Sequence, residues 1–231
     1  MTNIRSIVYA ACLITSLALT SRPASAGILC NTLGSGCTTL GPGNAYDGTN
    51  GYFVDGSTFH NQVIANSFTL GAGATVGDAM LALGNKAGGN NPVNVYIESD
   101  SGGEPGSILA SLSQVGTIPL WSNGSGGGLV TFTCSGAACT LGAGSYWLVA
   151  WEPDANTQQV WDFAYLDLPL VIFAYNTLGS PTGPWITDAP VTDAAFQIDG
   201  PNNTTPEPGS LILLGSGLLG LAGVVRRRRN F

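Results

Sequence analysis

The chain has 231 residues, and its 14 Asp and Glu side chains outnumber its seven Lys and Arg side chains, giving a formal net charge of −7. All the basic residues lie near the two ends except Lys86, so the middle of the chain is strongly acidic. Such a surface repels phosphate backbones and has no cationic patch from which counterions could be released. The charge therefore argues against nucleic acid as a partner.

Residues 1–26 have the pattern of a secretory signal peptide. Arg5 is followed by an apolar run over residues 7–19, and the segment ends in Ala24-Ser25-Ala26, the small-x-small pattern that signal peptidase cleaves. We expect export, cleavage by signal peptidase and a mature chain that begins at Gly27. An uncleaved N-terminal anchor is the alternative, but the apolar run is short for a membrane span.

Residues 27–205 are predicted to form a single domain, since this length is typical of one folded unit. Residues 27–51 are rich in Gly, Asn, Thr and Ser, and they predict an irregular loop. From Tyr52 onward, short β-branched and aromatic runs alternate with turn residues, which is the pattern of strands. The predicted strands cover residues 52–54, 58–70, 76–84, 93–98, 108–113, 129–134, 145–152, 158–166, 170–176 and 194–199.

Helical periodicity does not persist between residues 27 and 205, and glycine-rich breaks recur about every ten residues. This pattern predicts an all-β fold, an antiparallel β-sandwich that resembles a jelly roll. The strand at 145–152 shows the clearest alternation, because Trp147, Val149 and Trp151 fall on one face of it.

Four phrases in the middle of the chain carry a resemblance. They are Asn66-Ser-Phe-Thr-Leu70, Val93-Asn-Val-Tyr-Ile-Glu-Ser-Asp100, Gly103-Glu-Pro-Gly106 and Gly144-Ser-Tyr-Trp-Leu-Val149. Together they resemble the choice-of-anchor type of surface domain, which occurs with interchangeable C-terminal anchors. The resemblance implies a β-sandwich ectodomain with no established activity.

Glu98, Asp100 and Glu104 place carboxylates at alternate positions in a glycine-containing stretch, an arrangement that suits a hard cation such as calcium. The stretch lacks the length and the terminal acid of an EF-hand loop. An acidic turn without metal is the alternative, and no resident cofactor is expected.

Four cysteines remain after the signal peptide, namely Cys30, Cys37, Cys134 and Cys139. An even set in an exported protein predicts disulfides, for which three pairings are possible. We expect local pairing, because residues 134–139 form a hairpin-like loop and Cys30 and Cys37 bracket a glycine-containing loop. Zinc is the rival interpretation, but the spacings lack the C-x-x-C form and His60 is remote in sequence.

Catalytic patterns are weak in this chain. It has no G-x-S-x-G motif, and any catalytic triad would have to use His60, the sole histidine. We expect no catalytic residue and a structural role for His60. Glycoside hydrolysis needs two carboxylates, so a secreted polysaccharide-active hydrolase is the alternative function. Its candidate acids are Glu98, Asp100, Glu104, Glu152, Asp154, Asp162 and Asp167.

The tryptophans offer either core packing or a flat platform on which sugar rings can stack. Trp121 and Trp185 differ from the other three because each lies beside loop residues, in Trp121-Ser-Asn-Gly and Gly183-Pro-Trp185. We expect these two to be exposed, and they are the candidate carbohydrate contacts.

The C-terminal stretch has three parts in a fixed order. Pro206-Glu207-Pro208 comes first, an uncharged apolar run over residues 209–225 follows, and Arg226, Arg227, Arg228 and Arg229 come next. The run has about the minimum length for a transmembrane helix. Its glycines are common where membrane helices approach closely. The arginines should remain cytoplasmic, which leaves the domain outside the membrane.

This stretch, residues 206–231, resembles the PEP-CTERM sorting signal of Gram-negative bacteria that make extracellular polysaccharide. The resemblance implies processing by exosortase, a membrane transpeptidase-like enzyme that cuts near the Pro-Glu-Pro and removes the helix. An ordinary single-pass tail anchor is the alternative. Together the two ends predict a protein secreted across the inner membrane and anchored there before processing. Afterwards we expect a non-enzymatic protein at the cell surface or in the extracellular matrix, associated with exopolysaccharide.

Overall fold

The computed structural model describes residues 27–32, 46–87, 93–122, 126–164, 172–188 and 192–201. These residues belong to one compact unit, Ala26–Pro201. The predicted signal peptide, the Pro-Glu-Pro, the predicted helix at 209–225 and the four arginines all lie outside the described residues. Within those residues, no helix is long and apolar enough to span a membrane.

The domain is all-β and antiparallel, as the sequence predicts. One half of the sheet contains β1 (Ile28–Asn31), β2 (Tyr46–Asp55), β5 (Asp78–Ala87), β8 (Gly128–Thr133), β11 (Gln158–Ala164) and β14 (Phe196–Asp199). The other contains β3 (Val63–Leu70), β6 (Asn94–Asp100), β7 (Pro105–Val115), β10 (Gly144–Trp151), β12 (Phe173–Asn176) and β13 (Ile186–Asp188). A separate pair consists of β4 (Ala74–Thr75) and β9 (Thr140–Leu141), and β9 follows a short 3₁₀ turn, η1 (Ala137–Cys139).

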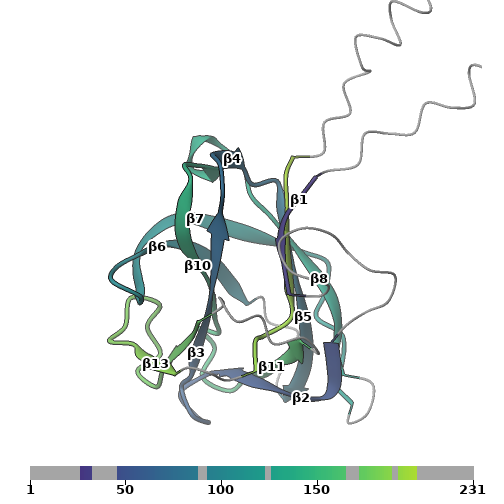
Figure 1. Ribbon diagram of the computed structural model, residues 1–231. Helices are drawn as coiled ribbons and strands as arrows, with labels where there is room; N and C mark the ends of the chain where they lie inside the picture. Colours follow the sequence, from purple (N-terminus) through teal and green to yellow (C-terminus); the bar gives the residue numbers. More distant parts are fainter. Residues whose placement is uncertain are drawn as a thin grey trace, which may run out of the picture. The chain divides into compact units, whose positions relative to one another are not determined.

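The two halves are not the separate sheets of the expected sandwich. Strand β7 pairs with β6 on one side and with β8 on the other, so twelve strands form one continuous sheet. Ten of them follow the order β1-β14-β5-β8-β7-β6-β10-β3-β12-β13, while β11 pairs with β5 and β2 pairs with β11. The sheet curls until its halves face each other (Figure 1). Tyr52 on β2 stacks on Phe173 on β12, with ring centroids 3.9 Å apart, which joins the two halves.

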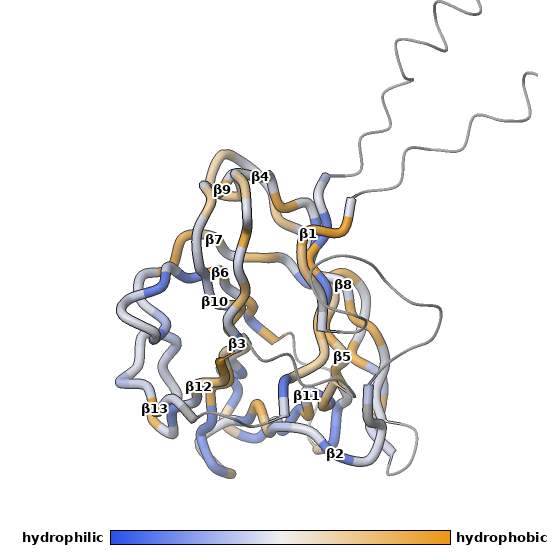
Figure 2. Tube along the Cα trace, in the orientation of Figure 1, coloured by the Kyte–Doolittle hydropathy of each residue, from blue (hydrophilic) through white to orange (hydrophobic). Residues whose placement is uncertain are grey.

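The main core fills the inside of the curled sheet. Strand β5 contributes Leu81 and Leu83, β11 contributes Trp161 and β10 contributes Leu148, all fully buried. Figure 2 shows apolar positions along β3 and β5, two of the strands that line this core. Because alternate side chains point to opposite faces of a strand, β10 also presents apolar residues to the outside.

A smaller cluster forms on that outer face of β3, β10 and β12. Trp147 and Val149 on β10 pack with Val63, Ala65, Ala174 and Trp185, and Trp151 lies against them. The predicted common face of Trp147, Val149 and Trp151 is therefore confirmed. The outer face of this half of the sheet is a second, minor core.

Each of the ten predicted strands corresponds to an observed one, but several boundaries are wrong, and β1, β4, β9 and β13 were not predicted. Residues 57–60 form a turn, and β3 begins only at Val63. Strand β2 begins at Tyr46, and β1 lies in the segment that we expected to be an irregular loop. Strand β1 is held at the edge of the sheet by its pairing with β14, a long-range contact that short local patterns do not reveal.

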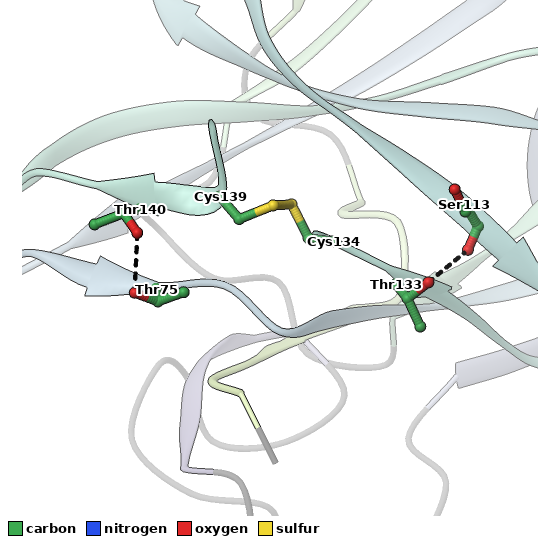
Figure 3. Close-up of a disulfide and its surroundings, with 6 residues drawn as sticks. All are labelled: Thr75, Ser113, Thr133, Cys134, Cys139 and Thr140. Atoms are coloured by element: carbon green, nitrogen blue, oxygen red, sulfur yellow. Dashed lines mark hydrogen bonds between the residues drawn. A yellow bond between two sulfur atoms is a disulfide. The ribbon is translucent and has the colours of Figure 1, made fainter. Parts of the chain in front are cut away.

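The predicted disulfide Cys134–Cys139 is present in the structure. It links the residue after β8 to the end of η1, immediately before β9, beside a hydrogen bond between the hydroxyls of Thr75 and Thr140 (Figure 3). Cys30 is also disulfide-bonded, and its predicted partner, Cys37, lies outside the described residues. The 134–139 bridge ties β8 to the small β4–β9 pair.

Candidate functional site

Trp121 is half-buried on the outer side of β5 and β11, where a fully buried carboxylate holds it. Its indole N–H donates a 3.0 Å hydrogen bond to Asp162 Oδ1, and the Gly127 N–H donates a 3.1 Å bond to Asp162 Oδ2. The backbone N–H of Trp121 also bonds to the Asn85 carbonyl. Gly84 gives the indole room, since a Cβ there would lie 2.6 Å from Trp121 Cβ and Cδ1.

Lys86 extends from β5 toward the same place. Its ammonium lies 4.6 Å from the ring centroid of Phe53 and 5.2 Å from that of Trp121. Contacts at these distances attract a cation to the negative face of an aromatic ring. Lys86 is the one lysine or arginine among the described residues, and it lies between two aromatic rings.

His60 extends this group by stacking on the other ring neighbour of Lys86. The His60 and Phe53 ring centroids are 5.6 Å apart, and their planes differ by 13°. His60 Nδ1 lies 2.7 Å from Asp55 Oδ2, and the buried Asp55 carboxylate also accepts bonds from the Gln62 N–H and the Gln158 amide. We call Phe53, His60, Lys86 and Trp121 the Trp121 surface.

Trp185, the other candidate carbohydrate contact, is not exposed as expected. It is only 8% exposed and packs in the minor core with Val63 and Trp147. Its indole N–H has no hydrogen-bond partner in the described part of the chain. The glycine and proline before Trp185 suggested a loop, but the ring folds back onto the sheet. The structure thus keeps Trp121 and Trp185 in different environments.

The three calcium candidates do not converge. Glu98 is fully buried opposite Trp147 on β10, and burial raises its pKa to about 8. Asp100 accepts a 2.8 Å hydrogen bond from the Trp147 indole, whereas Glu104 is exposed in the following turn. Across the described ranges, no group of three or more His, Cys, Asp or Glu side chains could hold a metal ion.

Glu152 is the second buried acid with a shifted pKa. Burial raises its pKa to about 7, although the hydrogen bond from the Asp154 N–H lowers it. Glu152 lies beside Gln159, and Gln159 faces the main core. Glu98 lies opposite Trp147 and therefore shares the outer face of the sheet with it. The two buried glutamates with raised pKa values therefore do not form a pair. Asp162, another candidate acid, is engaged by Trp121 and Gly127.

Trp121, His60 and Asp162 were named separately from the sequence but were not connected, and Trp121, which was expected to be exposed, is half-buried. Lys86 was notable only as an isolated cation, and Phe53 only as part of a strand. No local pattern connects residues 53, 86, 121 and 162, because they meet through the pairing of β2, β5 and β11. A single basic residue in an acidic domain was the one available signal.

Residues 204–229 match the PEP-CTERM protein-sorting motif. No curated protein matches the chain. The motif covers the Pro-Glu-Pro, the apolar run and the arginines, so the resemblance to the PEP-CTERM signal is confirmed, whereas the transmembrane helix at 209–225 stays a prediction. It implies an exported, membrane-sorted surface protein with exosortase as its processing partner. The resemblance of the middle region to choice-of-anchor domains stays a prediction.

Proposed function

We propose that this chain is a non-enzymatic protein of the cell surface or extracellular matrix, released from the inner membrane by exosortase. The observation that carries the proposal is the PEP-CTERM motif at 204–229, which follows directly on a disulfide-containing β domain. In this proposal the signal peptide directs export, the C-terminal helix retains the precursor in the membrane, and the β domain is the part that acts outside.

The domain's role in this proposal is to contact exopolysaccharide through the Trp121 surface. Aromatic rings offer sugars a large apolar face. The Lys86 ammonium over the Trp121 ring and His60 stacked on Phe53 add polar groups beside the part of the Trp121 indole that is exposed. Thirteen acids and one lysine between residues 27 and 205 disfavour a polyanionic ligand at long range. A neutral polysaccharide is therefore the favoured class.

A glycan array and a pull-down with exopolysaccharide, each run on the processed protein with and without calcium, test this role. We expect Trp121→Ala to weaken binding roughly three- to tenfold, the range that one aromatic stacking contact supports. Trp185→Phe is the matched control, because Trp185 is buried and should leave binding unchanged. Equal binding by wild type and Trp121→Ala would reject the site, and a strict calcium requirement would revive the metal interpretation.

The rival function, a polysaccharide hydrolase, draws support from the raised pKa values of Glu98 and Glu152, since a general acid must hold its proton near neutral pH. Against it, these two side chains lie on different faces of the sheet. Release of reducing sugar from the producer's own polysaccharide, abolished by Glu98→Gln or Glu152→Gln, would favour the hydrolase.

A further inference from the structure

The first and last described segments of the domain lie side by side. Strand β1 pairs antiparallel with β14, with Ile28 opposite Asp199. One step beyond, the Gly200 N–H donates a 2.8 Å hydrogen bond to the Gly27 carbonyl. Gly27 follows the predicted signal-peptide cleavage, and Gly200 precedes the sorting motif by four residues. Cleavage by signal peptidase and cleavage by exosortase therefore both act on segments that are joined to the same corner of the domain.

Strand β14 is the last of the described strands along the chain but does not lie at an edge of the sheet. It lies between β1 and β5, and its Phe196 and Ile198 are fully buried in the main core. The core is thus incomplete until residue 199 has crossed the membrane. In the folded domain, Pro201 lies close to Gly77 and directly follows Gly200, whose N–H is bonded to the Gly27 carbonyl.

Only a short tether separates this folded strand from the motif. Pro206 follows Pro201 by five residues, which can span at most about 18 Å when fully extended. An enzyme that cuts near Pro206 must then approach the folded domain closely. The surface it meets is the one around Gly27 and Pro201.

That surface is built from small, uncharged residues. A Cβ on Gly77 would lie 2.6 Å from Pro201 Cα, and the Val76 and Cys134 N–H groups bond to the carbonyls of Cys139 and Gly77 respectively. The exposed turns nearby, residues 71–73 and 135–138, contain only Gly, Ala and Ser. We call residues 27, 71–77, 134–139, 200 and 201 the exit corner (Figure 1).

The charge of the exit corner distinguishes it from the rest of the domain. Asp78 and Asp199 are the acids next to it; Asp199 is 9% exposed, and its pKa is raised by burial. After signal-peptide cleavage this corner carries the α-amino group of Gly27 and no exposed acid of its own, so, unlike the acidic remainder of the domain, it is not repelled when it comes within a Debye length, about 8 Å, of an anionic bilayer.

We propose that exosortase acts on the folded domain, and that the exit corner is the surface that faces the enzyme and the membrane during cleavage. This inference rests on the proposed processing by exosortase. It adds that the length of the tether between Pro201 and the motif limits the reaction. The tether acts through its length, which sets how far the motif can lie from the domain, and the enzyme does not recognise its side chains.

The test deletes Asn202 and Asn203 from the full-length precursor, which leaves the motif at 204–229 intact. Processing is followed by pulse-labelling in the native host and intact-mass measurement. We expect the processed fraction to fall several-fold, while replacement of the two asparagines by glycines leaves it unchanged. Normal processing of the deletion variant, or loss of processing in the glycine variant, would overturn the proposal.

A second variant tests whether the limit comes from the folded domain. Phe196→Asp places a charge in the core and prevents β14 from docking. Combined with the deletion, it should restore processing at early times after the pulse, before any degradation. Continued failure of the combined variant would contradict a role for the fold. Processing of the wild-type precursor in the same experiment reports separately on the sorting signal.

Discussion

Asp162 holds Trp121 through one hydrogen bond and Gly127 through a second. The side chain lies on β11 with its two oxygens bonded to the Trp121 indole and the Gly127 N–H. A buried carboxylate is costly unless donors satisfy it, so its partners are held firmly. The segment between β7 and β8 is consequently pinned across β5, where Lys86 and Phe53 complete the Trp121 surface.

Gly84→Ala should disturb this arrangement without touching any polar group. The new Cβ would lie 2.6 Å from Trp121 Cβ and Cδ1, so the indole must move away from Asp162. We expect a loss of about 1–3 kcal/mol in the free energy of unfolding, measured with urea. Gly71→Ala is the control, because a Cβ there meets nothing within 4 Å. Equal stability of the two variants would show that the indole is not packed as described.

The pH dependence of stability follows from the two buried glutamates. Burial raises the folded-state pKa of Glu98 from 4.5 to about 8 and that of Glu152 to about 7. Below pH 4.5 both states hold these protons. As the pH rises further, the unfolded chain releases them first, so stability falls until each folded-state pKa has been passed.

Variants of the two glutamates should separate the two pH ranges. Each group contributes at most about 1.4 kcal/mol per pH unit to the slope. Glu98→Gln should remove the decline that continues to about pH 8, and Glu152→Gln the part that ends near pH 7. Urea unfolding at several pH values provides the measurement. A wild-type stability that rises between pH 5 and pH 7 would contradict the sign of both shifts.

At the level of strands and turns, the sequence predicts most of the sheet because its signals are local. Alternation identified β10 correctly, and the glycine-rich breaks marked the turns that separate it from its neighbours. Strand β1 was missed because four residues at a sheet edge become a strand only through β14. The closure of two expected sheets into one was missed for a similar reason, since β7 joins them by pairing on both sides.

The candidate site was harder to predict than the fold. Trp121 could be named from its sequence neighbours, but its contacts come from β2, β5 and β11, which are distant in sequence. Trp185 was expected to be exposed because glycine and proline precede it, but its ring packs on the outer face of β3 and β10. The exposure of a tryptophan depends on tertiary packing, which the residues next to Trp121 and Trp185 in the sequence do not reveal.

The Cys134–Cys139 disulfide belongs to this scale because it links two elements. It closes a short loop between β8 and β9. A loop of this size stabilises a fold by about 2 kcal/mol on the chain-entropy estimate. Replacing both cysteines by serine should lower the melting temperature of the purified domain, measured by circular dichroism. Reduction of wild type should lower it further, because Cys30 is also disulfide-bonded. An unchanged melting temperature in the double variant would show that the bridge adds no stability.

Across the whole molecule, acidic and basic side chains lie in different segments of the chain. The β domain carries nearly all the acids, whereas four of the seven basic residues form the block Arg226–Arg229 inside the sorting motif. A cationic block resists transfer across the bilayer and keeps its side of the chain cytoplasmic. Lys86 is the one lysine or arginine between residues 27 and 205, too little positive charge among 13 acids to hold the domain to anionic lipid after cleavage. In the proposed processing, retention and release therefore depend on separate segments.

Changing Arg226, Arg227, Arg228 and Arg229 to serine should therefore disrupt sorting while leaving the β domain folded. Without the cationic block the C-terminal segment loses its retention signal, so we expect precursor to be mis-sorted or released with its apolar tail. Cell fractionation and intact mass of the recovered protein provide the measurement. The matched variant with four lysines keeps the charge and should be processed normally if charge alone retains the chain. Surface delivery of the serine variant at the wild-type level, with the tail removed, would show that the arginines are dispensable for sorting.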